Sequence, residues 1–319
     1  MQRLANLTAA LLLAAAVGLV SVQDQASAQE QKPAAPQGQV PGAAPAAKVP
    51  LTREQELQQA LEAAYKVAKV GPAEVKLGPQ GKISLPAGYQ YLPILEAARL
   101  MRAFGNRTGE TFLGMIVSTA DADGWISIID FKKAGYVKDD DAKVWNADEL
   151  LQSLKDGTEE ANEDRRTRGF PELEVAGWAE KPAYDATTHR LVWSALAQNK
   201  GAAPGSSGSV NYNTYALGRE GYYQLNLITS SQRIEADKRH AKALLAALAY
   251  EPGKRYEDFN PSTDKVAEYG LAALVAGVAA KKLGLLAAAG VFLLKFAKII
   301  AVAVGGLGLL ISKLFRRKA

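Results

Sequence analysis

The chain has 319 residues, no cysteine, only two histidines and a formal net charge of +5 at pH 7. The lack of cysteine excludes disulfide bonds, thiol catalysis and cysteine-bound metals. Residues 261–319 hold 9 Lys or Arg against 2 Asp or Glu, so the basic charge lies in the tail. Proteins that bind nucleic acids carry their basic charge on the folded domain, so we expect no nucleic-acid partner.

Residues 1–28 have the three parts of a secretory signal peptide. Arg3 is the positive start, residues 7–20 are an apolar run, and Ala26-Ser27-Ala28 is a small-x-small cleavage site. The run is shorter than the roughly 20 residues of a membrane helix, so we expect cleavage after Ala28. Residues 29–50, rich in Pro, Ala and Gln, predict a disordered linker.

Residues 51–260 predict one exported domain. We expect two hairpins, with turns at 78–81 and 121–124. Three or four further strands are expected, at 172–180, 189–198, 209–218 and 221–229. A turn is expected at 182–185. We expect four helices, which start at Thr52, Pro93, Asn146 and Ser230 or Ser231, the last one running through Tyr250. This pattern predicts an α+β fold, in which an antiparallel β-sheet built from hairpins packs against helices.

Residues 261–319 predict a C-terminal membrane anchor with a basic tail. Residues 296–314 are long and apolar enough to cross a bilayer. The shorter apolar runs 270–280 and 283–294 leave two alternatives: an interfacial helix followed by an extension of the span, or a helical hairpin. Eight basic residues are expected at the membrane interface: Lys281, Lys282, Lys295, Lys298, Lys313, Arg316, Arg317 and Lys318. The last of them favour a cytoplasmic C-terminus.

Acidic clusters are the first candidates for chemistry. Residues 119–130 resemble a calcium-binding loop through Asp121, Asp123 and Asp130, but their flanks have the pattern of strands, so we interpret them as a hairpin. Residues 139–141, three consecutive aspartates, are interpreted as a solvated loop before the next helix.

The two histidines, His189 and His240, have no spacing typical of a metal site, and we interpret them as surface or boundary residues. Neither a G-x-S-x-G elbow nor a phosphate-binding loop ending in G-K-[ST] is present. We therefore expect no catalytic residue, no cofactor and no metal.

One hairpin is crowded with residue types that are common in binding sites. The candidate binding residues are Asn211, Tyr212, Asn213, Arg219, Tyr222 and Tyr223, with Tyr215 between them. Tyr and Arg are over-represented at binding hot spots, but cross-strand tyrosines also stabilise hairpins. Both interpretations stay open.

Four segments carry a resemblance to a known family: "AGYVKDDDA", "VAGWAEKPAYDATTHRLVWSALA", "NYNTYALGREGY" and "YEDFNPSTDKVAEYGLAALVAG". With the apolar, lysine-containing tail, they resemble a bacterial family of predicted membrane-anchored proteins of unknown function, over about residues 70 to 315. The resemblance implies an envelope location and a C-terminal anchor. It implies no activity and no catalytic residue.

We therefore expect an envelope protein in the inner membrane of a bacterium, with its domain in the periplasm and its C-terminus in the cytoplasm. The expected role is a non-enzymatic binding or scaffold module that contacts the lipid bilayer and either an envelope protein or a second copy of itself. Two alternatives remain: a cell-envelope hydrolase that uses carboxylates such as Asp121, Asp123 or Asp130, and a subunit of a small membrane assembly.

Overall fold

The computed structural model describes residues 53–276, except residues 104, 105, 107, 121–123, 168 and 204. The described helices are α2 (Arg53–Lys66), α3 (Ile94–Ala103), α4 (Ala147–Thr167), α5 (Ile234–Ala247) and α6 (Ala273–Ala276), with 3-10 turns η1 (Asp140–Lys143) and η2 (Tyr256–Asp258). The described strands are β1 (Lys69–Val70), β2 (Ala73–Lys76), β3 (Gly81–Leu85), β4 (Tyr89–Leu92), β5 (Phe112–Ser118), β6 (Ile126–Lys132), β7 (Leu173–Asp185), β8 (Arg190–Asn199), β9 (Ser209–Leu217), β10 (Tyr222–Ser230) and β11 (Leu248–Tyr250).

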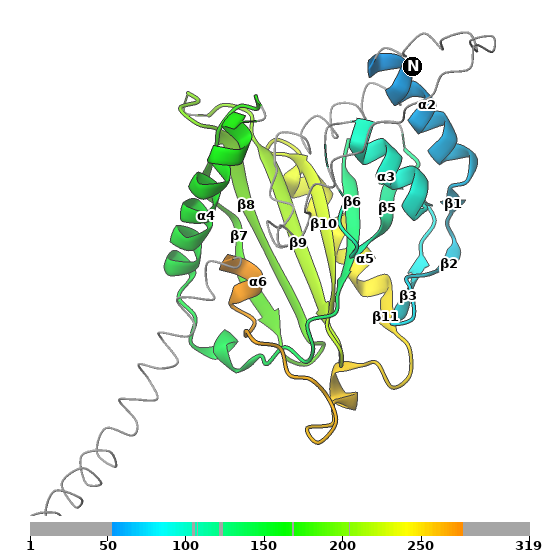
Figure 1. The fold of residues 1–319 in the computed structure, drawn as a ribbon, viewed down its shortest axis with the longest axis vertical. Coiled ribbons are helices and arrows are strands. Elements are labelled where there is room, and N and C mark those ends of the chain that lie inside the picture. The colour runs from blue at the N-terminus through cyan, green and yellow to red at the C-terminus, as the bar shows by residue number, and fades with distance from the viewer. Residues whose placement is uncertain are drawn as a thin grey trace, which may run out of the picture.

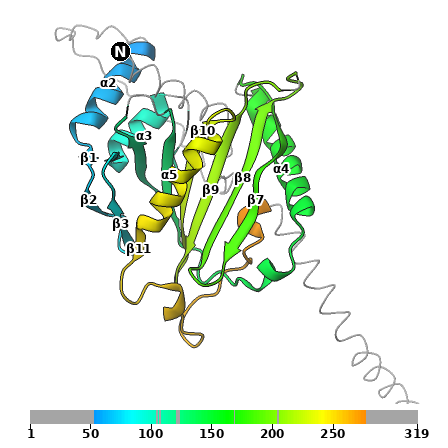
Figure 2. The same ribbon diagram turned by 180° about the vertical axis from the view of Figure 1, so that it is seen from behind.

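Eight of these strands form one antiparallel sheet in the order β1-β4-β5-β6-β10-β9-β8-β7. The other three form a small sheet in the order β11-β3-β2. Helices α2, α3, α4 and α6 lie on one side of the large sheet (Figure 1), and α5 and the small sheet lie on the other (Figure 2). The predicted α+β class with an antiparallel sheet is therefore confirmed.

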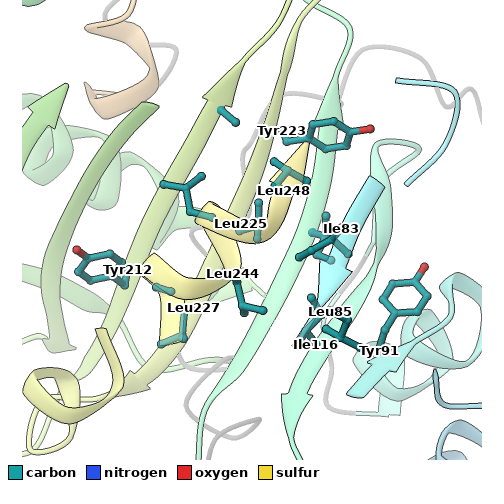
Figure 3. Packing of buried hydrophobic residues seen from close by; sticks show 14 of the residues in the cluster. Ile83, Leu85, Tyr91, Ile116, Tyr212, Tyr223, Leu225, Leu227, Leu244 and Leu248 are labelled. Carbon is teal, nitrogen blue, oxygen red and sulfur yellow. The ribbon is translucent and has the colours of Figure 1, made fainter. Parts of the chain in front are cut away.

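The side of the large sheet under α5 carries a continuous apolar core. Strands β9 and β10 point Tyr212, Tyr223, Leu225 and Leu227 into it, and α5 contributes residues such as Leu244. Figure 3 shows these side chains meeting others from β3, β4, β5 and β11. We call this side of the sheet the apolar face.

The opposite side is apolar only toward its two ends. At one end α2 and α3 pack on β5 and β6 through a cluster that includes Leu61, Leu100 and Met115. At the other end α4 and α6 pack on β7, β8 and β9 through a cluster that includes Leu154 and Trp193. The strands between these two clusters, β6, β10 and β9, carry the polar residues described below.

Two local predictions are wrong. The turn expected at 182–185 lies instead at 186–189, because β7 continues through Pro182 to Asp185. Strand β7 is an edge strand, where a proline without an N–H group is tolerated. The helix expected through Tyr250 ends at Ala247, because residues 248–250 pair with β3 instead.

Residues 256–276, which we call the strap, lead from η2 onto the sheet beside α4 (Figure 1). The sequence had placed residues 261–276 with the anchor, yet Leu271, Leu274 and Val275 are buried in the cluster under α4. Within the described part of the chain, no helix is long and apolar enough to cross a membrane. The predicted run 270–280 begins within the described residues, whereas its end, the runs 283–294 and 296–314 and the eight basic interface residues lie outside them.

Candidate binding face of the sheet

Four carboxamide side chains lie together at the centre of the sheet. Asn211 and Asn213 on β9, and Gln224 and Asn226 on β10, point to the same side, since alternate residues of a strand share a face. Asn226 lies directly opposite Asn213, and Gln224 lies opposite Asp130 of β6. We call these four amides and Asp130 the amide face; it lies on the side opposite the apolar face.

The amide face holds polar atoms that the fold does not satisfy. Asn211 is 6% exposed and Asn226 is 8% exposed, and the Oδ1 atom of each has no hydrogen-bond partner among the described residues. A buried acceptor without a partner costs about 1–3 kcal/mol. Two such groups between two apolar clusters lower the stability of the fold.

Gln224 organises the remaining contacts of the amide face. Its Nε2 group donates to Asn213 Oδ1 at 3.3 Å and to the Tyr215 hydroxyl at 3.2 Å. The Tyr215 hydroxyl in turn donates to the carbonyl of Leu274 in the strap at 3.0 Å, and Trp193 Nε1 donates to the same carbonyl at 3.2 Å. A chain of hydrogen bonds thus joins the amide face to the strap.

Asp130 gives the amide face its only acidic group. Thr111 Oγ1 donates to Asp130 Oδ1 at 2.8 Å, and Oδ2 has no hydrogen bond to a described residue. Burial raises the pKa of this carboxyl, and the Thr111 hydrogen bond and the charge of Lys132 oppose that shift only in part. No described Lys or Arg lies within ion-pair distance of Asp130, and Lys132 acts on its carboxyl only through the longer-range attraction between charges.

The hairpin that the sequence singled out is divided between the two faces. Asn211 and Asn213 belong to the amide face, whereas Tyr212 and Tyr223 are buried in the apolar core. Tyr222 is also buried, packed edge-on to Tyr215, and burial raises its pKa. Whether this hairpin binds a partner is not tested by its geometry and stays a prediction.

Arg219, the charged candidate of that hairpin, holds the strap. Its Nε and one terminal nitrogen donate to Asp264 Oδ2 and Oδ1 at 2.6 and 2.8 Å. This two-point contact holds the pKa of Asp264 below its ordinary range. The Arg219 guanidinium is therefore already engaged inside the chain.

The three consecutive aspartates have separate structural roles. Asp139 accepts a hydrogen bond from the Tyr184 hydroxyl at 2.7 Å, and Asp140 lies 3.9 Å from Lys143. Asp141 accepts from the backbone N–H groups of residues 271 and 272, both at 3.0 Å, and so fixes the strap near α6. The solvated-loop interpretation fits only Asp140.

The segment that resembles a calcium loop joins two strands. Strands β5 and β6 pair antiparallel on either side of it, as the hairpin interpretation predicts. Asp121 and Asp123 lie outside the described residues, and Asp130 lies within β6. The hydrolase alternative that would use these three carboxylates stays a prediction.

Both histidines are partly buried against aromatic rings. His240 Nδ1 lies 2.9 Å from the Tyr89 hydroxyl, and its ring stacks on Trp125. His189 has a positive φ of 52°, which His adopts more readily than most residues, and its ring lies on Tyr256 at the start of the strap. The description as boundary residues fits both positions.

Gln224 and Asn226 are the residues of the amide face that sequence reasoning missed. The alternation in "YYQLNL" was a usable signal for them. Tyr223 and the two leucines alternate with Gln224 and Asn226, which places the two amides on one face of the strand. The sequence does not reveal the strand order, and only the pairing of β10 with both β9 and β6 brings the polar residues together.

With this α+β fold, the chain belongs to the family described as "Protein of unknown function (DUF2167)", which matches residues 69–305. No curated protein matches it. Among solved structures it is similar to "Solution Structure of Cyanobacterial PsbP (CyanoP) from Synechocystis sp. PCC 6803", with 7% sequence identity and a TM-score of 0.34, over 58% of this chain and 91% of that chain. A likeness at that score carries no argument about function.

Proposed function

We propose that this chain is a membrane-anchored envelope protein whose α+β domain is a non-enzymatic binding module. The observation that carries the proposal is the pair of buried, unpartnered acceptors on the amide face, Asn211 Oδ1 and Asn226 Oδ1. Such acceptors lower the stability of a fold, and a ligand that donates hydrogen bonds to them would offset that cost.

The strap supports the second part of the proposal, the attachment to a membrane. Its contacts with Arg219, Asp141, Trp193 and Tyr215 tie the chain to the domain up to Leu274. The predicted span at residues 296–314 starts 20 residues after residue 276. A domain attached in this way stays near the membrane.

The test is photo-crosslinking of the full chain in intact cells. A diazirine amino acid at Gln224, at the centre of the amide face, should give a reproducible crosslinked partner. The same amino acid at Val144, which is 82% exposed and lies beside η1, is the control and should not give it. A chain that stays uncrosslinked from Gln224 in every growth condition would contradict a binding role.

The location is tested separately by cysteine labelling, which the absence of native cysteine makes clean. One cysteine is introduced at Ser207 and, in a second variant, one at Ala319. A membrane-impermeant maleimide that reaches the periplasm should label the first and not the second. Labelling of neither site would contradict export of the domain, and labelling of both would contradict a single crossing.

A further inference from the structure

We infer that the ligand of the amide face is an extended peptide that carries a basic side chain. The inference rests on the proposed binding function and names the class of ligand. It starts from three acceptors of this face that have no hydrogen-bond partner among the described residues: Asn211 Oδ1, Asn226 Oδ1 and Asp130 Oδ2. A ligand that satisfies them has to present hydrogen-bond donors.

The spacing of the amides fits a peptide backbone. Asn211 and Asn213 are two residues apart on β9, and Gln224 and Asn226 are two residues apart on β10. Side chains on one face of a strand repeat at about twice the 3.4 Å rise per residue. The N–H groups on one side of an extended peptide repeat at the same interval, so a peptide lying along β9 and β10 meets successive amides in register.

Carboxamides also match the chemistry of a peptide group. A carboxamide offers both donors and an acceptor, and it can therefore pair with the N–H and the C=O of a backbone amide. Gln224 shows the donor part of this capacity within the chain, since its Nε2 donates to two neighbours at once. A peptide fits the face better than a ligand that presents only acceptors, such as a phosphate.

Asp130 selects the charge of the ligand. Its carboxyl lies opposite Gln224, and both side chains are partly exposed, whereas the three asparagines are buried. Asp130 and Gln224 therefore form the accessible part of the face, where a ligand makes first contact. With no described cation in ion-pair distance, this carboxylate favours a lysine or arginine side chain over an acidic one.

The experiment measures peptide binding to the full chain in detergent micelles by fluorescence anisotropy. Three dansyl-labelled pentapeptides of alanine differ only in a central lysine, glutamine or glutamate. We expect the lysine peptide to bind at least about tenfold more tightly than the glutamate peptide. Asp130→Asn should abolish this difference, and Asn211→Leu combined with Asn226→Leu should weaken binding of all three about tenfold or more.

Thr214→Val is the matched control, because Thr214 lies on β9 between the two asparagines but points to the other face. It should leave all three affinities unchanged, and circular dichroism should show that every variant is folded. Equal binding of the three peptides, no binding of any, or unchanged affinity in the double variant would overturn the inference.

Crosslinking from Gln224 separates this inference from the proposed function. A reproducible glycan or lipid crosslink, together with no peptide binding, leaves a binding module with a different ligand. A crosslink to residues 29–50 or 277–319 of the same chain shows that the chain covers its own amide face and overturns the inference. Absence of both crosslinks and peptide binding contradicts the function as well.

Discussion

The two faces of the large sheet are built from the same strands with opposite chemistry. On β9 and β10, Tyr212, Leu225 and Leu227 enter a continuous apolar core. The residues that alternate with them, such as Asn213 and Asn226, form the amide face. Both sides bury polar atoms without partners among the described residues: Tyr212 Oη, Trp125 Nε1 and Ser194 Oγ on the apolar side, and Asn211 Oδ1 and Asn226 Oδ1 on the amide face.

This contrast shows that one strand can carry opposite chemistry on its two faces. Side chains with a period of two separate the two chemistries without a change in the backbone. The apolar face contributes the burial that drives folding. The unpartnered acceptors of the amide face lower that stability, so their removal and the removal of packed side chains from the apolar face should have opposite effects.

The largest effect is expected on the apolar face. Leu227 is fully buried there, and Leu227→Ala removes packed methyl groups and leaves a cavity. We expect a loss of about 2–5 kcal/mol in the free energy of unfolding. Urea unfolding of the full chain in detergent measures it, and a loss below about 1 kcal/mol would show that this face is not the core of the fold.

A satisfied polar group on the apolar face should give a smaller loss. The Thr214 hydroxyl is fully buried and donates to the Leu225 carbonyl at 3.1 Å. Thr214→Val removes this hydrogen bond while keeping the shape, so we expect a loss of about 1 kcal/mol in the free energy of unfolding. A gain in stability instead would erase the distinction between the two faces.

The strap should respond to acid. Arg219 holds the pKa of Asp264 below its ordinary value of about 3.9, so the pair stabilises the fold at neutral pH, and this contribution is lost as pH falls through the lowered pKa. Asp264→Asn should lower the thermal midpoint at pH 7 and have no effect in strong acid. An equal effect at both pH values would show that the charge pair is not the cause.

The smallest effect is expected at Asp130. Burial raises its pKa, so the charged form is disfavoured in the fold and costs stability as pH rises above the unfolded value of about 3.9. Asp130→Asn should therefore raise the thermal midpoint slightly at pH 7 and leave it unchanged near pH 3. A lower midpoint at pH 7 would mean that the carboxylate is paired within the fold.

Local patterns in the sequence predicted most elements of the fold. Asn146 begins α4 as expected, with its Oδ1 accepting from the N–H of Asp148, and the hairpins at β2–β3, β5–β6 and β9–β10 formed. Residues 248–250 became a strand because the edge of β3, distant in sequence, offers a partner. No local propensity signals that contact.

The candidate site was only half predictable for the same reason. Asn211 and Asn213 stood out in a tyrosine-rich hairpin, but Asp130 joins them only through the pairing of β6 with β10. The role of Arg219 was hidden as well, because its partner Asp264 is 45 residues away in the chain. Contacts between distant segments decided both outcomes.

The most direct test of the account is the free energy of unfolding of the double variant Asn211→Leu with Asn226→Leu. Leucine has nearly the shape of asparagine and removes the two unpartnered acceptors. We predict a gain of about 1 kcal/mol or more, together with the loss of crosslinking from Gln224 in cells. A loss of stability would show that the fold itself satisfies these amides, and it would contradict the claim that the amide face exists to bind a ligand.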